Sequence, residues 1–186
     1  MNRTPLARLL ALALLLAAGT AWAYEAGERV ANFSGVDAAG RRHSLDDVRG
    51  KPVVLVVWSS KCPASRSYGP ALQRLAKRFA GRAVFLGIAP SAGETPESVR
   101  EGKRRAGIEF PVLLDAGGRI ARSFGAVMTP SVYVIDGERI LRYQGSVADR
   151  PRDPKQPHLE RALEAVLAGR RPPRAKTRVV GFRIQY

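Results

Sequence analysis

The sequence contains a single cysteine, Cys62, in 186 residues. One thiol excludes an internal disulfide, although proteins of oxidising compartments usually pair their cysteines. Cys62 is therefore either a buried, inert residue or a free thiol kept for reactivity. The residues around it decide between these two more than its number does.

Histidine is also scarce, because His43 and His158 are the only two in the chain. They stand far apart in sequence among polar residues, which is typical of solvated surface positions. A metal site needs three or four convergent ligands. The sequence therefore predicts no metal, and it implies no organic cofactor.

Acidic residues are few, with 16 Asp and Glu against 31 Lys and Arg and a net charge of +15. The excess is densest after the last acid, Glu164, where six cations follow: Arg170, Arg171, Arg174, Lys176, Arg178 and Arg183. Such an excess of positive charge is typical of proteins that bind nucleic acid or an anionic membrane surface. Because no nucleic-acid motif is present, we interpret the charge as a solvated basic surface that could contact anionic surfaces, with no nucleic-acid partner.

Long hydrophobic runs are absent except near the N-terminus, where Leu9 to Ala18 follows Arg3 and Arg8 and precedes Ala21-Trp22-Ala23. This order is typical of a secretory signal peptide, and the run is short for a membrane span. We predict a signal peptide over residues 1–23, a domain over 24–169 and a basic C-terminal tail over 170–186. The mature chain would be exported to the periplasm and soluble, with an uncleaved membrane anchor as the alternative.

The remaining pattern alternates predicted strands with predicted helices. The continuous apolar run Val53 to Trp58 predicts a central strand buried on both faces. Further strands are expected over 83–89 and 110–114 and in a hairpin of 131–135 with 139–143, and helices over 63–80, 96–106, 118–124 and 159–167. This alternation predicts a three-layer α/β domain.

Cys62 stands where the first of these strands passes into a helix. It comes four residues after Trp58 and directly before Pro63. Proline is favoured in the first helical turn, and a helix N-terminus stabilises a negative group, so this position favours a thiolate. Ser59 and Ser65 could donate hydrogen bonds to it, although Ser65 could equally be a filler of the helical turn.

These features together resemble the thioredoxin-like superfamily: a W-x-x-x-C motif at Trp58 to Cys62, Pro70 in the next helix, and Thr129-Pro130 before a strand. The longer segments CPASRSYGP and TPSVYVID resemble an exported redoxin family related to thioredoxins and peroxiredoxins, of the AhpC-TSA type. The resemblance implies a central mixed β-sheet flanked by helices. It also implies that Pro130 is a cis-proline beside the thiol, and that the backbone before it pairs with an extended substrate segment. An ordinary trans proline that begins a strand is the alternative.

The chain departs from the pattern of a dithiol thioredoxin at three positions. Ser65 replaces the second cysteine, Gly181-Phe182 stands where the resemblance suggests a G-C pair, and Val56 replaces a buried acid. A mixed disulfide on Cys62 would then need an external thiol for its release. We therefore expect an exported monothiol thiol-disulfide oxidoreductase whose partner is a thiol- or disulfide-bearing protein or a small thiol; the sequence does not indicate an oligomeric state.

Two other functions remain open. The first is a one-cysteine peroxidase, in which Ser59 would fit the position of the hydroxyl residue of the peroxiredoxin motif. Leu55, however, replaces the proline expected in that motif. Pro130 replaces the arginine that would polarise the peroxide, so Arg66 or Arg142 would have to take the place of that arginine. The second is a non-catalytic thioredoxin-like interaction domain. Trp58 is expected to be a core residue flanking the site, and Glu94 a surface residue with a functional acid as the alternative.

Overall fold

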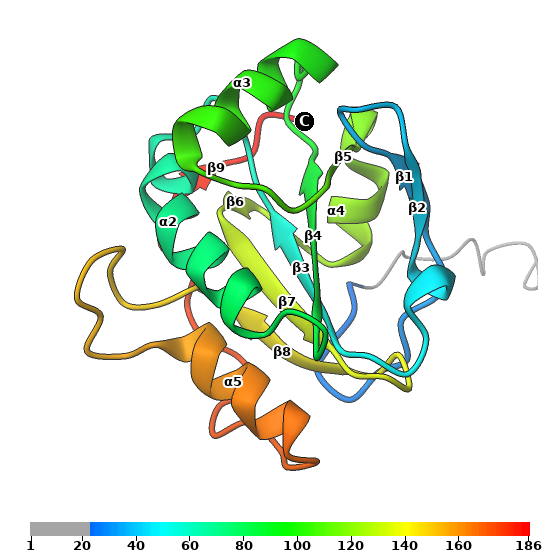
Figure 1. The fold of residues 1–186 in the computed structure, drawn as a ribbon, viewed down its shortest axis with the longest axis vertical. Coiled ribbons are helices and arrows are strands. Elements are labelled where there is room, and N and C mark those ends of the chain that lie inside the picture. Colours follow the sequence, from blue (N-terminus) through cyan, green and yellow to red (C-terminus); the bar gives the residue numbers. More distant parts are fainter. Residues whose placement is uncertain (1–22) are drawn as a thin grey trace, which may run out of the picture.

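The computed structural model describes residues 23–186 (Figure 1). The predicted signal peptide lies outside the described residues except for Ala23. The central sheet has five strands in the order β5 (Val112–Leu114), β4 (Val84–Ala89), β3 (Val53–Val57), β7 (Ser131–Ile135) and β8 (Leu141–Gly145). β3 runs parallel to β4 and antiparallel to β7, so the sheet is mixed, as predicted.

The other elements surround this sheet. The helices are η1 (Leu45–Val48), α2 (Pro63–Arg78), α3 (Pro96–Ala106), η2 (Ala116–Gly118), α4 (Arg119–Ser123) and α5 (His158–Leu167). The short strands β1 (Ser34–Val36) and β2 (Arg42–Ser44) form a hairpin, and β6 (Met128–Thr129) pairs with β9 (Phe182–Arg183). In the described residues no helix is both long and apolar enough to cross a bilayer.

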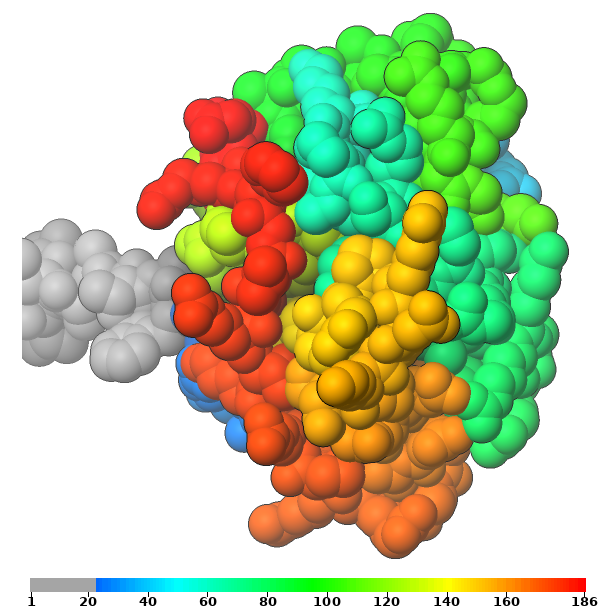
Figure 2. Space-filling model, turned by 90° about the vertical axis from the view of Figure 1, so that its left-hand side faces the viewer, coloured from blue at the N-terminus to red at the C-terminus, as the bar shows by residue number. Residues whose placement is uncertain are grey.

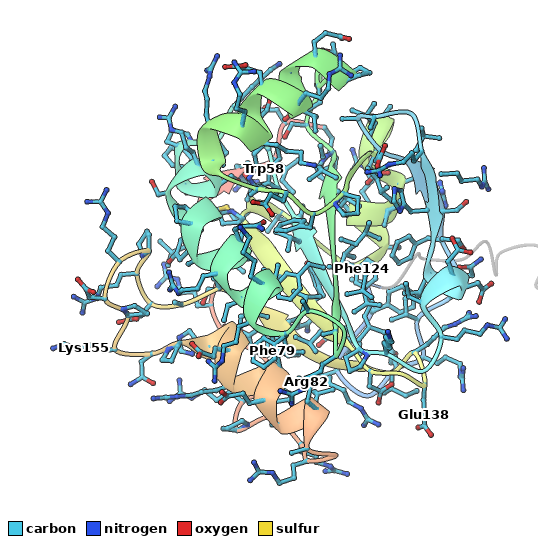
Figure 3. All side chains as sticks on the ribbon, in the orientation of Figure 1. Trp58, Phe79, Arg82, Phe124, Glu138 and Lys155 are labelled. Atoms are coloured by element: carbon cyan, nitrogen blue, oxygen red, sulfur yellow. The ribbon has the colours of Figure 1, made fainter. Side chains whose placement is uncertain are left out.

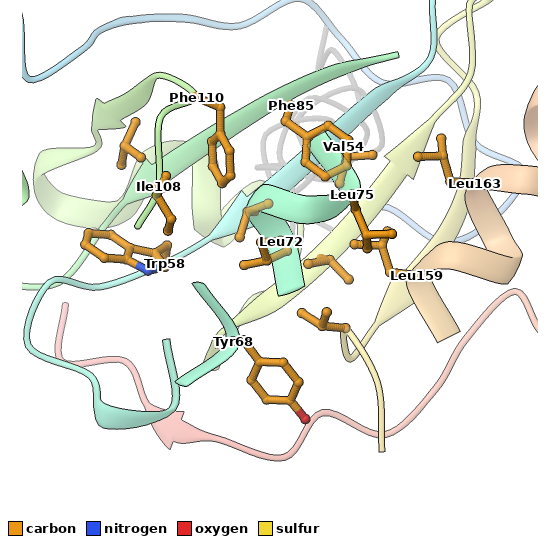
Figure 4. Close-up of a cluster of buried hydrophobic side chains, with 14 of the residues drawn as sticks. Val54, Trp58, Tyr68, Leu72, Leu75, Phe85, Ile108, Phe110, Leu159 and Leu163 are labelled. Carbon is orange, nitrogen blue, oxygen red and sulfur yellow. The ribbon is translucent and has the colours of Figure 1, made fainter. Parts of the chain in front are cut away.

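The core lies on both faces of β3. Val54 and Val56 pack into a cluster with α2, α3 and α5, whereas Val53, Leu55 and Val57 pack into a second cluster with α4 and the N-terminal segment. Figure 1 shows α2 and α5 on one side of the sheet and α4 on the other, and Figure 4 shows part of the first cluster. Because side chains alternate along a strand, an all-apolar run is buried on both sides, which confirms the predicted three layers.

The apolar stripe of α2 explains how this helix is held. Tyr68, Leu72 and Leu75 are buried against the sheet, while the opposite face is basic. Gly69 lies against α3, since a Cβ placed there would come within 2.2 Å of the carbonyl oxygen of Ala106. Pro70 lies inside the helix on its exposed side. The helix that Cys62 caps is therefore fixed against both the sheet and α3.

The predicted hairpin of β7 and β8 forms, but its second strand begins at Leu141 and not at Arg139. The carboxylate of Asp136 accepts hydrogen bonds from the N–H groups of Glu138 (2.9 Å) and Ile140 (2.8 Å), which lengthens the turn. The left-handed residue is Arg139, with φ 65°. Gly137 serves another purpose, because a Cβ there would lie 2.8 Å from the backbone of Gly50.

The basic C-terminal segment packs along the domain. Thr177 donates its N–H to the carbonyl oxygen of Gln144 on β8 (3.0 Å), and β9 then pairs with β6. Figure 2 shows this segment in red, lying across the surface beside the start of α2. Its last residues are attached as well, since Ile184 is only 6% exposed.

Asp37 organises the hairpin of β1 and β2, and His43 belongs to the same cluster instead of standing free in solvent. The carboxylate accepts hydrogen bonds from the backbone of Ala39 and Arg41 (2.8 and 2.9 Å) and lies 2.8 Å from Nε2 of His43. Burial raises the pKa of Asp37, but the hydrogen bonds from Arg41, His43 and Ala39 outweigh it and lower the pKa to about 2.

This lowered pKa predicts acid sensitivity. A carboxyl whose folded pKa lies below its unfolded value stabilises the fold above about pH 4 and loses that contribution as the pH falls through about 2. We expect Asp37→Asn to lower the free energy of unfolding at pH 7 by about 2 kcal/mol and to flatten its decline between pH 5 and 2. Urea titrations across this range measure both effects.

Glu138 offers the matched control, because it is exposed and points away from the domain (Figure 3). Glu138→Gln should leave the pH profile of stability unchanged. A steep acid decline that survives in Asp37→Asn would contradict the assignment.

Candidate functional site

Three segments meet at one end of the central sheet. The carboxyl ends of the parallel strands β3 and β4 lie side by side, so the loops that carry Cys62 and Glu94 emerge together. β7 runs the opposite way and begins there, with Ser131 opposite Val57. The register therefore brings Thr129-Pro130 beside the residue where β3 ends.

Cys62 is the N-cap residue of α2, and its side chain is 6% exposed. Its sulfur accepts a hydrogen bond from the N–H of Ser65 (3.3 Å), as a capping side chain does, and lies 3.4 Å from the carbonyl oxygen of Thr129. The Ser65 N–H thus donates to the sulfur, whereas the Thr129 carbonyl oxygen accepts a hydrogen bond from the thiol. The sulfur is held between these two backbone groups.

The Thr129–Pro130 peptide bond is cis. Thr129 is 1% exposed, and its carbonyl oxygen faces the Cys62 sulfur. The next residue, Ser131, is the first of β7 and donates its hydroxyl to the carbonyl oxygen of Met128 (2.6 Å). The segment before Pro130 therefore forms one wall of the surroundings of Cys62.

Of the two serines, Ser65 donates a hydrogen bond to the sulfur, whereas the Ser59 hydroxyl donates to Glu94, which corrects the expectation for Ser59. Ser65 is fully buried and contacts the sulfur through its backbone N–H, while its hydroxyl oxygen accepts from the N–H of Ser59 (3.3 Å). The Ser59 hydroxyl donates to Glu94 (2.8 Å). Both side chains are occupied in shaping the loop between β3 and α2.

Glu94 is the residue that sequence reasoning undervalued, since the surface reading is wrong. It is half-buried, and its carboxylate accepts four hydrogen bonds, from the hydroxyls of Ser59 (2.8 Å), Ser60 (2.5 Å) and Ser98 (3.0 Å) and from the N–H of Ser60 (2.9 Å). Hydrogen bonds to a charged acceptor are stronger than neutral ones. Glu94 therefore ties the loop before Cys62 to the start of α3.

Trp58 is a core residue flanking the site, as predicted. It is 1% exposed and packs with Ile108 and the α2 side chains, beside α3 (Figures 3 and 4). A Cβ at Gly102 of α3 would lie 2.6 Å from Ser60 and 2.7 Å from the Trp58 ring. Only a residue without a side chain lets α3 approach the loop this closely.

Cys62 lies on the wall of a cavity of about 310 Å³. The cavity is lined by residues of three regions: Ser59, Lys61, Cys62 and Pro63; Ser91 and Ala92; and Thr129 with Phe182, Arg183 and Gln185 of the C-terminal segment. Arg66 and Arg142 are not among them. Arg142 pairs with Asp136 (2.6 Å) at the far end of β7, whereas Arg183 reaches the cavity from β9.

Metal ligation has no support in the part of the chain that the structure describes. Within residues 23–186 no three His, Cys, Asp or Glu side chains come together as a metal site would require. The chemistry available near Cys62 is therefore that of one thiol, a backbone carbonyl, a hydrogen-bonded carboxylate and the cations of Lys61 and Arg183.

The chain is similar in sequence and in fold to known proteins. A family model described as the AhpC/TSA family matches residues 26–144. The thiol-disulfide oxidoreductase ResA of Bacillus thuringiensis is 30% identical over 112 residues, which make up 60% of this chain and 64% of ResA. This chain thus spans less than two thirds of that relative's length.

Solved structures agree on the fold. A hypothetical protein from Sinorhizobium meliloti 1021 matches with a TM-score of 0.79 and 28% identity, over 89% of this chain and 96% of that one. Peroxidoxin BcpB from Mycobacterium tuberculosis matches with a TM-score of 0.60 and 25% identity, over 78% and 97% respectively. The thioredoxin domain of a thiol-disulfide oxidoreductase from Bacteroides vulgatus also matches, with a TM-score of 0.57 and 20% identity over 64% of this chain and 86% of that one, so the fold is thioredoxin-like.

The Glu94 network predicts that this carboxylate stabilises the loop before Cys62. We expect Glu94→Ala to lower the free energy of unfolding by about 2–3 kcal/mol, because it leaves the Ser60 N–H without its charged acceptor. The loosened loop should also let iodoacetamide reach Cys62 several-fold faster, on the order of 3- to 10-fold.

Glu109→Ala is the control, since Glu109 is exposed and its side chain makes a single surface ion pair with Lys77 (2.9 Å). Such a pair contributes at most about 1 kcal/mol. Equal stability and equal alkylation rates in the two variants would show that Glu94 does not hold the loop.

Proposed function

The chain belongs to the AhpC/TSA family, and from this we propose that it is a thiol-disulfide oxidoreductase that acts through Cys62 alone. The observation that carries the proposal is the setting of the sulfur. It caps α2, accepts the Ser65 N–H, and lies on a cavity wall beside the cis Thr129–Pro130 bond. ResA, which bears the name thiol-disulfide oxidoreductase, supports the same class of reaction.

The reaction would proceed by two thiol-disulfide exchanges. The Cys62 thiolate attacks one sulfur of a disulfide R–S–S–R′, a Cys62–S–S–R bond forms, and R′–S⁻ leaves and takes a proton from solvent. A second thiol, R″–SH, then loses its proton and attacks the adduct, which releases R–S–S–R″ and restores Cys62. The electrons come from that second thiol, so the protein returns to its starting state.

An external thiol is needed because no second thiol stands near Cys62. Ser65 occupies the position three residues along the helix. Phe182, which stands where the family resemblance suggests a second cysteine, lines the same cavity as Cys62. The described residues near Cys62 also provide no evident acceptor for a proton during the exchange. Val56 is fully buried among apolar side chains, and the Glu94 carboxylate already accepts four hydrogen bonds.

Export belongs to the same proposal. The order of charge, apolar run and A-x-A over residues 1–23 is that of a signal peptide whose removal would leave Tyr24 first. Tyr24 packs against Phe124, with ring centroids 5.2 Å apart, and donates its N–H to the carbonyl oxygen of Ser123 (3.0 Å). These contacts support a mature domain that begins at Tyr24, and the signal-peptide pattern alone supports its action in the periplasm.

The mechanism predicts a stable adduct. Treated with a small disulfide, the wild-type chain should form a mixed disulfide that persists until a thiol is added, and Cys62→Ser should form none. Ser65→Cys should release its partner without added thiol and shorten the life of the adduct at least about tenfold, because a thiol three residues along the helix can attack it. Intact mass spectrometry follows each species.

Ser67→Cys is the matched control, since Ser67 is exposed on the same helix and adds a thiol without placing it beside Cys62. Adducts in the wild-type chain that are equally abundant in Cys62→Ser would refute the proposal. The chain would then be better described as a non-catalytic interaction domain.

A peroxidase is the second candidate, favoured by Arg183 on the cavity wall and by the likeness to peroxidoxin BcpB. Cys62 would reduce a peroxide ROOH to ROH and become a sulfenic acid. Against it, the Ser59 hydroxyl donates to Glu94. If the candidate is right, stoichiometric hydrogen peroxide produces a sulfenic acid at Cys62, and Arg183→Gln slows its formation about tenfold or more; absence of the sulfenic acid, read by dimedone labelling, eliminates it.

A further inference from the structure

The chain's own C-terminus occupies the strand edge next to Cys62. β9 pairs antiparallel with β6, with Phe182 opposite Thr129 and Arg183 opposite Met128. Thr129 is the residue whose carbonyl oxygen lies 3.4 Å from the Cys62 sulfur. A short exposed edge is where an extended peptide would add as a further strand. Here that place is already filled.

Gly181 is fitted to this position. A Cβ at Gly181 would lie 2.2 Å from the Thr129 carbonyl oxygen and 3.4 Å from the nitrogen of Pro130. Gly181 does not have a positive φ, so the backbone conformation itself would admit an alanine. Glycine is required at this position only because the backbone of residue 181 lies so close to the Thr129 carbonyl oxygen. Any side chain at residue 181 would therefore disturb the contact between the C-terminal segment and Thr129.

The segment is anchored on both sides of Gly181. Upstream, Thr177 binds Gln144 through its N–H and the Tyr143 hydroxyl through its side chain (2.7 Å). Downstream, Ile184 donates its N–H to the carbonyl oxygen of Val127 (2.9 Å) and is buried. At the end, the Tyr186 ring lies under the Arg122 guanidinium (3.8 Å). The strand therefore belongs to the folded domain.

What remains open to Cys62 is the cavity of about 310 Å³. That volume stands at the lower end of the range of roughly 300–1,000 Å³ for small-molecule sites. Two cations, Lys61 and Arg183, line it, and none of its lining residues is acidic. Both its size and its charge suit a small anionic compound.

We propose that β9 keeps extended polypeptides away from Cys62 and that the site exchanges with low-molecular-weight anionic thiols and their disulfides. The inference rests on the proposed function and names its substrate class. In the exchange, the Cys62 thiolate attacks one sulfur of the small disulfide, the bound half remains on Cys62, and the other half leaves as a thiolate. A different small anionic thiol, R″–SH, then loses its proton, attacks the bound half and releases it as the disulfide R–S–S–R″, which restores Cys62.

The test compares rates of mixed-disulfide formation on Cys62 with four probes. Oxidised glutathione is anionic, hydroxyethyl disulfide is neutral, cystamine is cationic, and the fourth is an extended peptide whose cysteine is joined by a disulfide to a second copy of the same peptide, so that an alkyl thiolate leaves in every case. We expect oxidised glutathione to react faster than cystamine by about tenfold or more. Lys61→Gln and Arg183→Gln should each lower the ratio of the glutathione rate to the neutral rate about threefold.

Gly181→Ala tests the role of the strand. The added methyl displaces β9 from Thr129, so the ratio of the peptide rate to the glutathione rate should rise about tenfold or more. Val180→Ala is the matched control, because Val180 is 66% exposed and its truncation leaves the fit at Gly181 intact. If Gly181→Ala does not fold, a chain shortened to end at Val180 should show the same rise in the ratio of the peptide rate to the glutathione rate.

The outcomes separate the two claims. Two results would overturn the inference while Cys62 still reacts with small disulfides, so that the proposed function stands. In the first, the peptide reacts as fast as oxidised glutathione in the wild-type chain. In the second, Gly181→Ala and the shortened chain both leave the ratio of the peptide rate to the glutathione rate unchanged. If cystamine reacts as fast as oxidised glutathione, the anionic preference is overturned. If Cys62 reacts with none of the four probes, the proposed function itself fails.

Discussion

The carbonyl oxygen of Thr129 is the contact on which the site depends. The Cys62 sulfur lies 3.4 Å from it, and Gly181 approaches it so closely that no side chain fits between them. Its place follows from the sheet, because the antiparallel register of β3 and β7 sets Ser131 opposite Val57. One backbone atom thus joins the central sheet, the N-terminus of α2 and the C-terminal segment, and a shift of any of these would change the surroundings of the thiol.

The parts of this arrangement that could be predicted from sequence are those with strong local signals. A continuous apolar run is buried on both faces of a sheet, so Val53 to Val57 identify the central strand. Pro63 marks the first helical turn, which places Cys62 at the cap. Thr95 and Gly107 likewise mark the ends of α3. Local rules sufficed here because each element is specified by residues within a few positions of one another.

The parts that sequence reasoning missed depend on contacts between distant residues. Glu94 stands in a polar loop and resembles any surface acid, and its hydrogen bonds to the loop before Cys62 span 34 and 35 residues. β9 has only two residues inside a basic, proline-containing segment, too few for any periodic pattern. The available cues were an acid, Glu94, directly before the Thr95 helix cap and a glycine directly before Phe182, but neither shows which distant atom the residue would contact. The same limit explains the serines, whose hydroxyls turn toward Glu94 and Ser59 and away from the sulfur.

The tail sits in recesses that exist because glycines lack side chains. A Cβ at Gly145 would lie 2.1 Å from the Thr177 hydroxyl, one at Gly181 would lie 2.2 Å from Thr129, and one at Gly118 would lie 2.1 Å from the Tyr186 ring. A strand attached at three points to its own domain is a tethered ligand, whose effective concentration at its site is on the order of millimolar or above. An external peptide would have to compete against that local concentration, whereas a small solute that enters the cavity would not. The rate at which Cys62 reacts with a protein partner would therefore depend less on the concentration of that partner than on the strength of the three contacts that hold the C-terminal segment to the domain.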